Sequence, residues 1–262
     1  RRARKYLRQH AIAVNQVWNY CVAQQRDTEM RYSAGAKPRR WATHFDLQKY
    51  TKGVGKEFSI QQQTVGEVCR QFAQSRDQAR GAPKFRASFG VRRALGWVPF
   101  GKQSRQVRGN IVTYCRRSFR FWEGKRPLPD EAKGGCFVED ARGRWYACFY
   151  VESAEDRITG TGKLGLDLGL INLAACSTGE IIKAPRHYRT LERKLAIAQL
   201  AGNRQRVRAI HARIKNSRKD FIHKITSRMT KENDTIVVGN INAARHCRTW
   251  IAKSVYDAGW SK

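Results

Sequence analysis

The stretch Lys163-Leu-Gly-Leu-Asp167-Leu-Gly169-Leu170 decides the fold. It is short and almost wholly apolar, which is typical of a buried strand, and it contains a single carboxylate at Asp167. A carboxylate within so apolar a run is costly unless it is paired, hydrogen-bonded or bound to a metal ion. The flanking glycines, Gly165 and Gly169, would let a substrate backbone or phosphate come close. We therefore treat Asp167 as the first candidate for a catalytic or metal-binding residue.

The residues that follow predict a sheet with a long helical crossover. After Asp167 we expect two further strands, a helical stretch broken near Gly202-Asn203, and a short buried strand, at 172–176, 180–183, 187–231 and 235–238 respectively. The resulting order of strand, strand, strand, helix and strand is how a ribonuclease H-like sheet begins. Alone, the Asp167 motif leaves three interpretations open: a metal-dependent nuclease, a phosphate turn of actin-like ATPases, or a plain strand-end turn.

The residues before this sheet divide into two regions. Residues 1–80 carry apolar side chains at helical spacing, for example Val65, Val68 and Phe72, which predicts core packing. Short strands are expected beyond Gly81, the clearest being a hairpin at 136–151 with its turn at 140–143. The predicted fold is an α+β multidomain protein. It has a helical domain at 1–80, a β-barrel-like domain at 81–157 and an incomplete ribonuclease H-like α/β domain at 158–262.

The net charge of the chain indicates the class of its partner. The 262 residues include 52 Lys and Arg against 21 Asp and Glu, which gives a formal net charge of +31. Hydrophobic residues make up 41% of the chain, which is enough to bury a core and excludes a disordered basic tail. So much positive charge on a folded chain indicates a polyanionic partner, most commonly nucleic acid. No run of 18 apolar residues occurs, so no membrane-spanning helix is expected.

Basic and aromatic residues interleave between Lys84 and Arg108, and basic residues line one face of the predicted helix between Arg204 and Lys219. Cations contact phosphates and rings stack on bases, although a plain basic sheet or helix face would have the same composition. We predict nucleic-acid binding by Arg86, Arg92, Arg93, Trp97, Lys102, Arg105, Arg204, Arg208, Lys215 and Lys219.

The seven cysteines point to an intracellular protein. Their number is odd, they are scattered, and they include no C-x-x-C pair, which argues against a disulfide framework or a zinc ribbon in these residues. We expect a reducing, cytoplasmic compartment of a prokaryote. Because the chain begins with Arg1 and not with Met, part of the natural N-terminus is expected to precede it.

Several motifs together closely resemble the TnpB family of transposon-encoded, RNA-guided nucleases, which are related to the type V CRISPR effectors. The similarity is most specific between Lys163 and Trp260 and looser between Gly81 and Val151. It is carried by the Asp167 strand and by Ala184-Pro-Arg-His-Tyr188, Arg213-Ile-Lys-Asn-Ser-Arg-Lys-Asp220, Ile236-Val-Val238 and Ala252-Lys-Ser-Val-Tyr-Asp257-Ala-Gly-Trp260.

The resemblance implies an RNA-guided DNA endonuclease with a recognition domain, a wedge domain and a RuvC-like nuclease domain. Its partners would be a guide RNA and a double-stranded DNA target beside a short adjacent motif, with sequence selected by guide pairing. Cleavage in this family uses Mg²⁺ ions held by Asp, Glu and Asp. Asp167 matches the first of these metal ligands.

Two departures from the family pattern bear on activity. The second carboxylate normally ends the strand that here reads Val237-Val238-Gly239-Asn240, and neither Gly239 nor Asn240 carries a charge. The third Asp and a zinc-binding ribbon belong beyond Trp260 in the family, so zinc is expected only in such a ribbon. One carboxylate does not make a two-metal site.

Three explanations stay open. In the first, the natural chain continues past Lys262 with the missing residues. In the second, another acid replaces the second carboxylate, with Asp257, Glu180 and Glu192 as weak candidates. In the third, the protein is a nuclease-inactive, RNA-guided DNA binder that acts like a repressor. Asp257 is better explained as a structural residue of its helix motif. A basic RNA-binding structural protein is a further alternative, from a different functional class.

Overall fold

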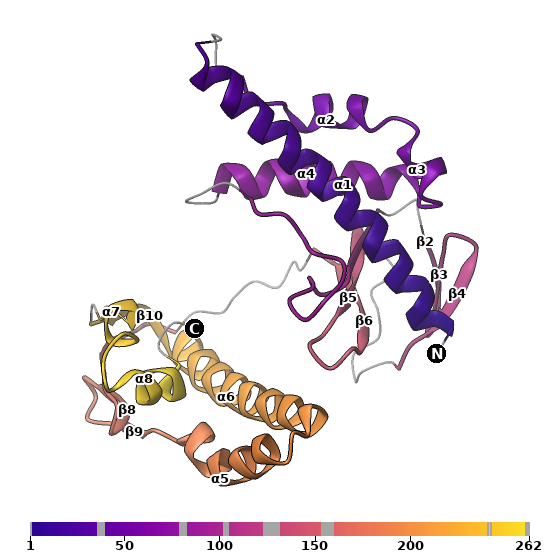
Figure 1. Ribbon diagram of the computed structural model, residues 1–262. Helices are drawn as coiled ribbons and strands as arrows, with labels where there is room; N and C mark the ends of the chain where they lie inside the picture. The colour runs from indigo at the N-terminus through magenta and orange to yellow at the C-terminus, as the bar shows by residue number, and fades with distance from the viewer. Residues whose placement is uncertain are drawn as a thin grey trace. The chain divides into compact units, whose positions relative to one another are not determined.

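A computed structural model describes most of the chain. The described residues are 2–35, 40–78, 83–101, 105–122, 132–152, 160–239, 241 and 243–259. They form two compact units, Arg1–Ser153 and Ala154–Lys262, and each is considered by itself (Figure 1). Within the described ranges, no helix has the length and apolar character needed to cross a membrane.

Helices form the first half of the Arg1–Ser153 unit. The apolar stripe predicted around Phe72 is confirmed, since Val65, Val68 and Phe72 are all buried in the core. A capping box at Thr43 and Asp46 fixes the start of the second helix, because each side chain accepts a hydrogen bond from the other residue's backbone. The helices are α1 (Arg2–Ser33), α2 (His44–Tyr50), α3 (Val54–Glu57) and α4 (Gln62–Gln78).

Two separate antiparallel sheets follow the helices. One has the strand order β1-β5-β6 and includes the predicted hairpin, and the other has the order β2-β3-β4. The strands are β1 (Trp97–Gly101), β2 (Arg105–Arg108), β3 (Ile111–Tyr114), β4 (Arg117–Arg120), β5 (Gly134–Glu139) and β6 (Trp145–Tyr150).

The described strands do not form a closed barrel, so the barrel-like expectation is not met. Side chains join the two sheets in place of a continuous ladder of backbone hydrogen bonds. The ring of Phe137 packs against those of Tyr114 and Phe119, with centroids 5.7 and 5.6 Å apart. The Tyr114 hydroxyl also lies 2.7 Å from that of Thr64 on α4, so one core holds helices and sheets together. The three-domain division stays a prediction.

The Ala154–Lys262 unit has the element order that the sequence predicts. Its sheet has the order β10-β7-β8-β9, in which β10 runs parallel to β7 and the other neighbours are antiparallel. The elements are β7 (Gly162–Leu168), β8 (Asn172–Cys176), β9 (Ile181–Lys183), α5 (His187–Leu200), α6 (Arg204–Glu232), β10 (Asn233–Val238), α7 (Ala243–His246) and α8 (Ala252–Ala258).

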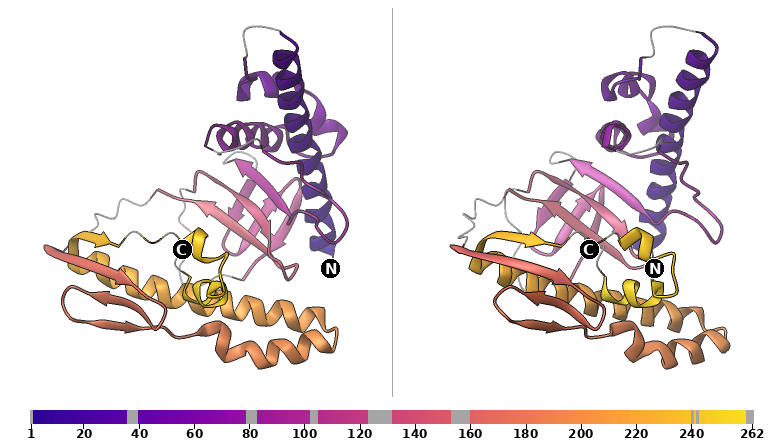
Figure 2. Two further views of the ribbon diagram at one scale, coloured as in Figure 1. Left: turned by 60° about the vertical axis from the view of Figure 1, so that its left-hand side comes forward. Right: turned by 90° about the vertical axis from the view of Figure 1, so that its left-hand side faces the viewer.

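Two small apolar clusters hold this unit. Leu164, Ala174 and Ile182 of the sheet pack with Met229 of α6. A second cluster joins α5 to α6, which lie side by side as an antiparallel pair (Figure 2). The break between them is where the sequence places it, since Asn203 caps α6 by accepting a hydrogen bond from the Arg206 amide.

The prediction that the last strand is buried is wrong. Val237 is 65% exposed and Val238 is 50% exposed, although both belong to an apolar run. Among the described residues β10 pairs only with β7, and this leaves its other edge uncovered. Hydrophobic content alone does not report whether a strand has neighbours on both sides.

Candidate functional site

Asp167 lies near the end of β7 and is exposed. The strand alternates, with Leu164 in the core and Lys163 and Asp167 facing away from it. The expected burial of the carboxylate is therefore wrong, and no cost of burial has to be compensated by a partner. Its carboxylate has no hydrogen bond or ion pair to any residue that the structure describes.

The glycines flanking Asp167 are close to the chain itself. A Cβ atom on Gly169 would lie 2.8 Å from the Asn172 carbonyl oxygen, and one on Gly165 would touch Ser177 at 3.4 Å. The Gly165 amide donates a hydrogen bond to the Ser177 hydroxyl. Gly169 therefore accommodates the tight connection of β7 to β8, and Gly165 packs against the turn that follows β8. The expected approach of a substrate at these glycines stays a prediction.

Gly239 is the immediate neighbour of Asp167 on the adjacent strand. The Gly239 amide donates to the Leu166 carbonyl oxygen at 2.9 Å, which extends the parallel pairing by one residue. A Cβ atom on Gly239 would lie 3.7 Å from Asp167 Oδ1, in ordinary van der Waals contact. A longer acidic side chain at residue 239 would thus start beside the Asp167 carboxylate. Asn240, the other residue predicted at this strand end, lies outside the described residues.

The three substitute acids suggested by the sequence are each engaged by other groups. Glu180 accepts a hydrogen bond from Arg228, and Glu192 forms an ion pair with Lys253. Asp257 accepts hydrogen bonds from the amides of Tyr188 and Arg189 at 2.7 and 3.3 Å. This position of Asp257, at the start of α5, agrees with the structural role predicted for it.

No metal cluster is found among the residues described. These residues contain no group of three or more His, Cys, Asp or Glu side chains that could hold a metal ion. One exposed carboxylate beside a glycine does not fit two Mg²⁺ ions. The seven cysteines are free thiols, and no disulfide links the described residues.

Arg86 and Trp97, two of the predicted nucleic-acid-binding residues, pack inside the first unit. The Arg86 guanidinium stacks on the Trp18 ring, 3.7 Å from its centroid, and lies 5.0 Å from that of Trp97. Burial lowers the pKa of Arg86 to about 10. Trp97 itself packs, partly buried, against the core.

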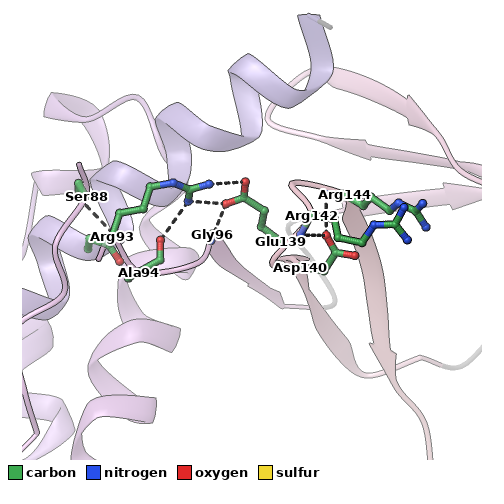
Figure 3. Close-up of polar contacts among 9 residues, drawn as sticks. Ser88, Arg93, Ala94, Gly96, Glu139, Asp140, Arg142 and Arg144 are labelled. Carbon is green, nitrogen blue, oxygen red and sulfur yellow. Dashed lines mark hydrogen bonds and ion pairs between the residues drawn. The ribbon is translucent and has the colours of Figure 1, made fainter. Parts of the chain in front are cut away.

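Arg93 forms a bidentate ion pair with Glu139 on β5 (Figure 3). Arg93 Nη1 donates to Glu139 Oε2 at 2.7 Å and Nη2 donates to Oε1 at 2.8 Å, while the Gly96 amide donates to the same carboxylate. The Glu139 side chain is only 5% exposed. The hydrogen bonds from Arg93 lower the pKa of Glu139 against the effect of burial. Arg93 therefore ties the segment before β1 to the hairpin.

The remaining predicted residues of the first unit are only partly covered by the structure. Arg92 is exposed. Arg105 begins β2, with a side chain outside the description, and Lys102 lies outside the described residues altogether.

The predicted residues of α6 form an exposed stripe. Arg204, Arg208, Lys215 and Lys219 are all exposed, and their spacings of four, seven and four residues place them on one face of the helix. Apolar side chains of α6, among them Ile210 and Ile214, are buried on another face. The helix therefore keeps this basic stripe in water, where it is available to an anionic partner.

Comparison with known proteins gives consistent matches. Residues 146–248 match the sequence family OrfB_IS605, described as a probable transposase. The chain is also 33% identical over 156 residues to a protein of Streptomyces pristinaespiralis that carries the name of an RNA-guided DNA endonuclease. These matches support the resemblance to the TnpB family. The matched family segment includes Asp167, Gly239 and all of α6.

A second relative supports the TnpB assignment. The RNA-guided DNA endonuclease InsQ of Escherichia coli K12 is 22% identical over 196 residues. The two matches cover 52% and 63% of this chain but only 38% and 43% of the respective relatives. This chain thus corresponds to about two fifths of the length of the TnpB-type relatives that it matches.

One pair of residues at the start of α5 was not predicted from the sequence. Arg186 and His187 line a cleft together with residues of α6 and α8. The quoted motif Ala184-Pro-Arg-His-Tyr188 contains both, but nothing in its composition separates them from a solvated helix start. What distinguishes Arg186 is its left-handed backbone conformation, which is known only from the structure.

Proposed function

We propose that this protein takes part in RNA-guided DNA targeting as a TnpB-type DNA endonuclease, with a guide RNA and double-stranded DNA as partners. The observation that carries the proposal is the position of Asp167. It stands exposed near the end of a strand that pairs in parallel with the strand after the helical crossover, in a chain whose relatives are named RNA-guided DNA endonucleases. In this proposal Asp167 is a catalytic metal ligand.

The distribution of charge supports a nucleic-acid partner. The chain has a net charge of +31, and part of this charge lies in the basic stripe of α6, whose members are all exposed. Lys and Arg side chains of this kind neutralise phosphates whatever the base sequence, which suits a protein whose sequence selection is delegated to a guide.

A second candidate function is guided binding without cleavage, in which the protein acts by occupying its target. The observation that favours it is Gly239. The backbone of residue 239 is beside the Asp167 carboxylate, but glycine has no side chain to contribute there. The basic structural RNA-binding protein is the less favoured alternative, because it gives no role to Asp167.

Mg²⁺ is the cation that cleavage by this class of enzyme implies. Because Asp167 is the one described acidic side chain at the candidate site, the described residues alone do not fit two such ions. Cleavage by this protein would require further acidic ligands besides Asp167.

Plasmid cleavage by the purified ribonucleoprotein tests the proposal. The copurified RNA is sequenced, and a plasmid carrying the complementary target is incubated with Mg²⁺. We expect target-dependent cleavage that Asp167→Asn lowers by roughly a hundredfold or more. The matched control is Asp220→Asn on α6, which removes one exposed carboxylate elsewhere and should leave cleavage unchanged. A heterogeneous RNA population with no dominant species would contradict the guided mechanism.

Gly239→Glu separates the two candidate functions. Without a cation, a carboxylate placed beside Asp167 is repelled by it, so we expect the variant to melt at a lower temperature in EDTA and to recover in Mg²⁺. If the wild type binds its guided target but does not cut it, and Gly239→Glu cuts, the occupancy function is supported for the wild type. If the wild type already cuts and loses cleavage with Asp167→Asn, the nuclease function is supported.

A further inference from the structure

A cleft opens at the start of α5 in the Ala154–Lys262 unit. It has a volume of about 440 Å³. Its walls come from the β7–β8 connection, the first turn of α5, α6 and α8, which neighbour one another in this unit (Figure 1). It contains three arginines, Arg186, Arg189 and Arg218, against one carboxylate, Asp257.

The base of the cleft is fixed by Asp257. This carboxylate accepts two backbone amides at the start of α5, and its Oδ1 atom lies 3.6 Å from Arg218 Nη2. The side chains of Arg218 and Asp257 are only 16% and 6% exposed. The negative charge of Asp257 is thus compensated by Arg218 and by the helix N-terminus, so that the cleft as a whole stays positive.

Two nitrogen atoms of cleft residues are buried with no hydrogen-bond partner among the described residues. They are Arg218 Nε and His187 Nε2. The other ring nitrogen of His187, Nδ1, lies 2.9 Å from the Ser217 hydroxyl, and when that hydroxyl donates, Nε2 carries the proton. Arg218 Nε is always a donor. Because buried donors are rarely left unpaired, Arg218 Nε, joined by His187 Nε2 in that tautomer, indicates a missing acceptor.

Arg186 has a strained backbone conformation and a positively charged side chain that is unpaired among the described residues. It has φ 49° and ψ 50°, in the left-handed region that disfavours non-glycine residues. Its exposed guanidinium has no hydrogen bond or ion pair to any described residue. Strained residues persist where the surrounding structure requires them, often at ligand sites.

The rest of the cleft is apolar. Leu170, Pro185 and Phe221 contribute to its lining. The Phe221 ring lies edge-on to that of His187, with centroids 5.8 Å apart. A wall of this kind accommodates a flat, weakly polar group beside the donors.

We propose that this cleft binds one nucleotide of a nucleic-acid strand, with the phosphate at Arg186, Arg218 and His187 and the base against the apolar wall. The inference rests on the proposed function in that it takes the ligand from the nucleic acid that the protein binds. A strand is favoured over a free nucleotide because Lys215 and Lys219 lie exposed on α6, within one turn of Arg218. They provide charge for phosphates on either side of the bound one.

Binding of a fluorescent single-stranded pentanucleotide to the full chain, freed of RNA in high salt, tests this inference. The titration contains neither guide nor Mg²⁺, so no cleavage occurs. We expect Arg186→Gln to weaken binding roughly tenfold, as for one charge-assisted hydrogen bond. Arg206→Gln removes the same charge from an exposed residue of α6 outside the basic stripe and should weaken binding less than about twofold. Equal losses in the two variants would overturn the inference.

Photo-crosslinking locates the bound base. A thiothymidine at the centre of the pentanucleotide should crosslink to peptides containing Pro185 or Phe221 in the wild type, and the yield should fall in Arg186→Gln. Crosslinks confined to other peptides would contradict the proposed site.

Arg186→Gly distinguishes a binding role from a structural one. Glycine adopts the left-handed conformation without strain, so this variant should fold at least as stably as the wild type and yet bind the pentanucleotide as weakly as Arg186→Gln. Unchanged binding by a stable Arg186→Gly variant would show that Arg186 has no part in binding.

Competition distinguishes the source of the nucleotide. Unlabelled pentanucleotide should displace the fluorescent one. Inorganic phosphate and a nucleoside monophosphate should do so only at concentrations roughly a hundredfold higher than the unlabelled pentanucleotide requires. Equal potency of the monophosphate would reject the strand and assign the cleft to a free nucleotide. Because these measurements need no guide, metal or cleavage, they can fail while the proposed nuclease function holds, and the reverse is also possible.

Discussion

The charged residues that the sequence singled out are held differently in the two units of this protein. In the Arg1–Ser153 unit one core joins helices and sheets, and Arg86 and Arg93 are held by rings and by a buried carboxylate. In the Ala154–Lys262 unit the cores are small, and the basic stripe of α6 and the Asp167 carboxylate remain exposed. Arg86 and Arg93 of the first unit are thus internal ties, whereas the basic stripe of α6 in the second unit is free for a partner.

Arg93 and Arg186 show the contrast at single residues. Both follow short loops in basic, aromatic-containing segments, and the sequence gives no reason to separate them. Arg93 has a buried partner in Glu139, while Arg186 has none among the described residues. The position of a carboxylate, and not the arginine itself, determines which one is structural.

Removing the Arg93–Glu139 ion pair of the first unit should have the largest effect on the free energy of unfolding. Glu139→Ala leaves Arg93 without its partner and the Gly96 amide without an acceptor, and we expect a loss of about 3 kcal/mol in the free energy of unfolding. Urea denaturation measures it. Glu152→Ala, which removes a carboxylate that is 77% exposed and pairs with Lys133, should change stability by less than about 0.5 kcal/mol. Similar losses in both variants would contradict the buried-tie interpretation.

The corresponding tie in the second unit is Asp257. Asp257→Ala removes the cap of α5 and leaves Arg218 unpaired, and we expect a cost of about 2 kcal/mol. Hydrogen exchange should show faster exchange of the Tyr188 and Arg189 amides. Asp220→Ala is the control, because Asp220 is 64% exposed and pairs only with Lys224 among the described residues. Unchanged amide exchange in Asp257→Ala would exclude the capping role.

Acid should weaken both units over the same range of pH. Burial lowers the pKa of His10 in the first unit and of His187 in the second below the ordinary value of 6.5. The unfolded chain then binds protons before the folded chain does, so stability is full above about pH 6.5 and falls as pH drops through the window below it. Each histidine contributes at most about 1.4 kcal/mol per pH unit.

Unfolding free energies measured between neutral and mildly acidic pH check this expectation. His10→Gln should flatten the pH dependence, whereas the same change at His211, which is exposed on α6, should not. An unaltered slope in His10→Gln would assign the acid sensitivity to other groups.

Arg186→Gly should have the smallest effect on stability, and of the opposite sign. Relief of the left-handed backbone is expected to stabilise the chain by about 1 kcal/mol, partly offset by the entropy of glycine in the unfolded state. Thermal melting measures the gain. Gly179→Ala is the reverse control, since Gly179 has φ 89° with no atom near its missing Cβ, and the change should destabilise through the backbone alone.

The sequence predicted the order of elements in the second unit, the hairpin at β5 and β6, and the core face of α4. These follow from local periodicity and from turn residues, which act over a few residues at a time. The predicted burial of Asp167 and β10 was wrong, because exposure depends on what covers the second face and the outer edge of a sheet. The barrel-like expectation failed for a related reason, since strand composition does not state which strands pair.

Sequence alone therefore provided the prediction of a polyanionic partner, the likeness to TnpB and the candidate Asp167. These depend on net charge and on motifs that are contiguous in the chain. Tertiary structure decided which arginines are ties and which are free. It also placed Gly239 beside Asp167 and assembled the cleft at α5 from four separate segments. Such arrangements depend on contacts between residues that are far apart in sequence, which no local pattern of residues encodes.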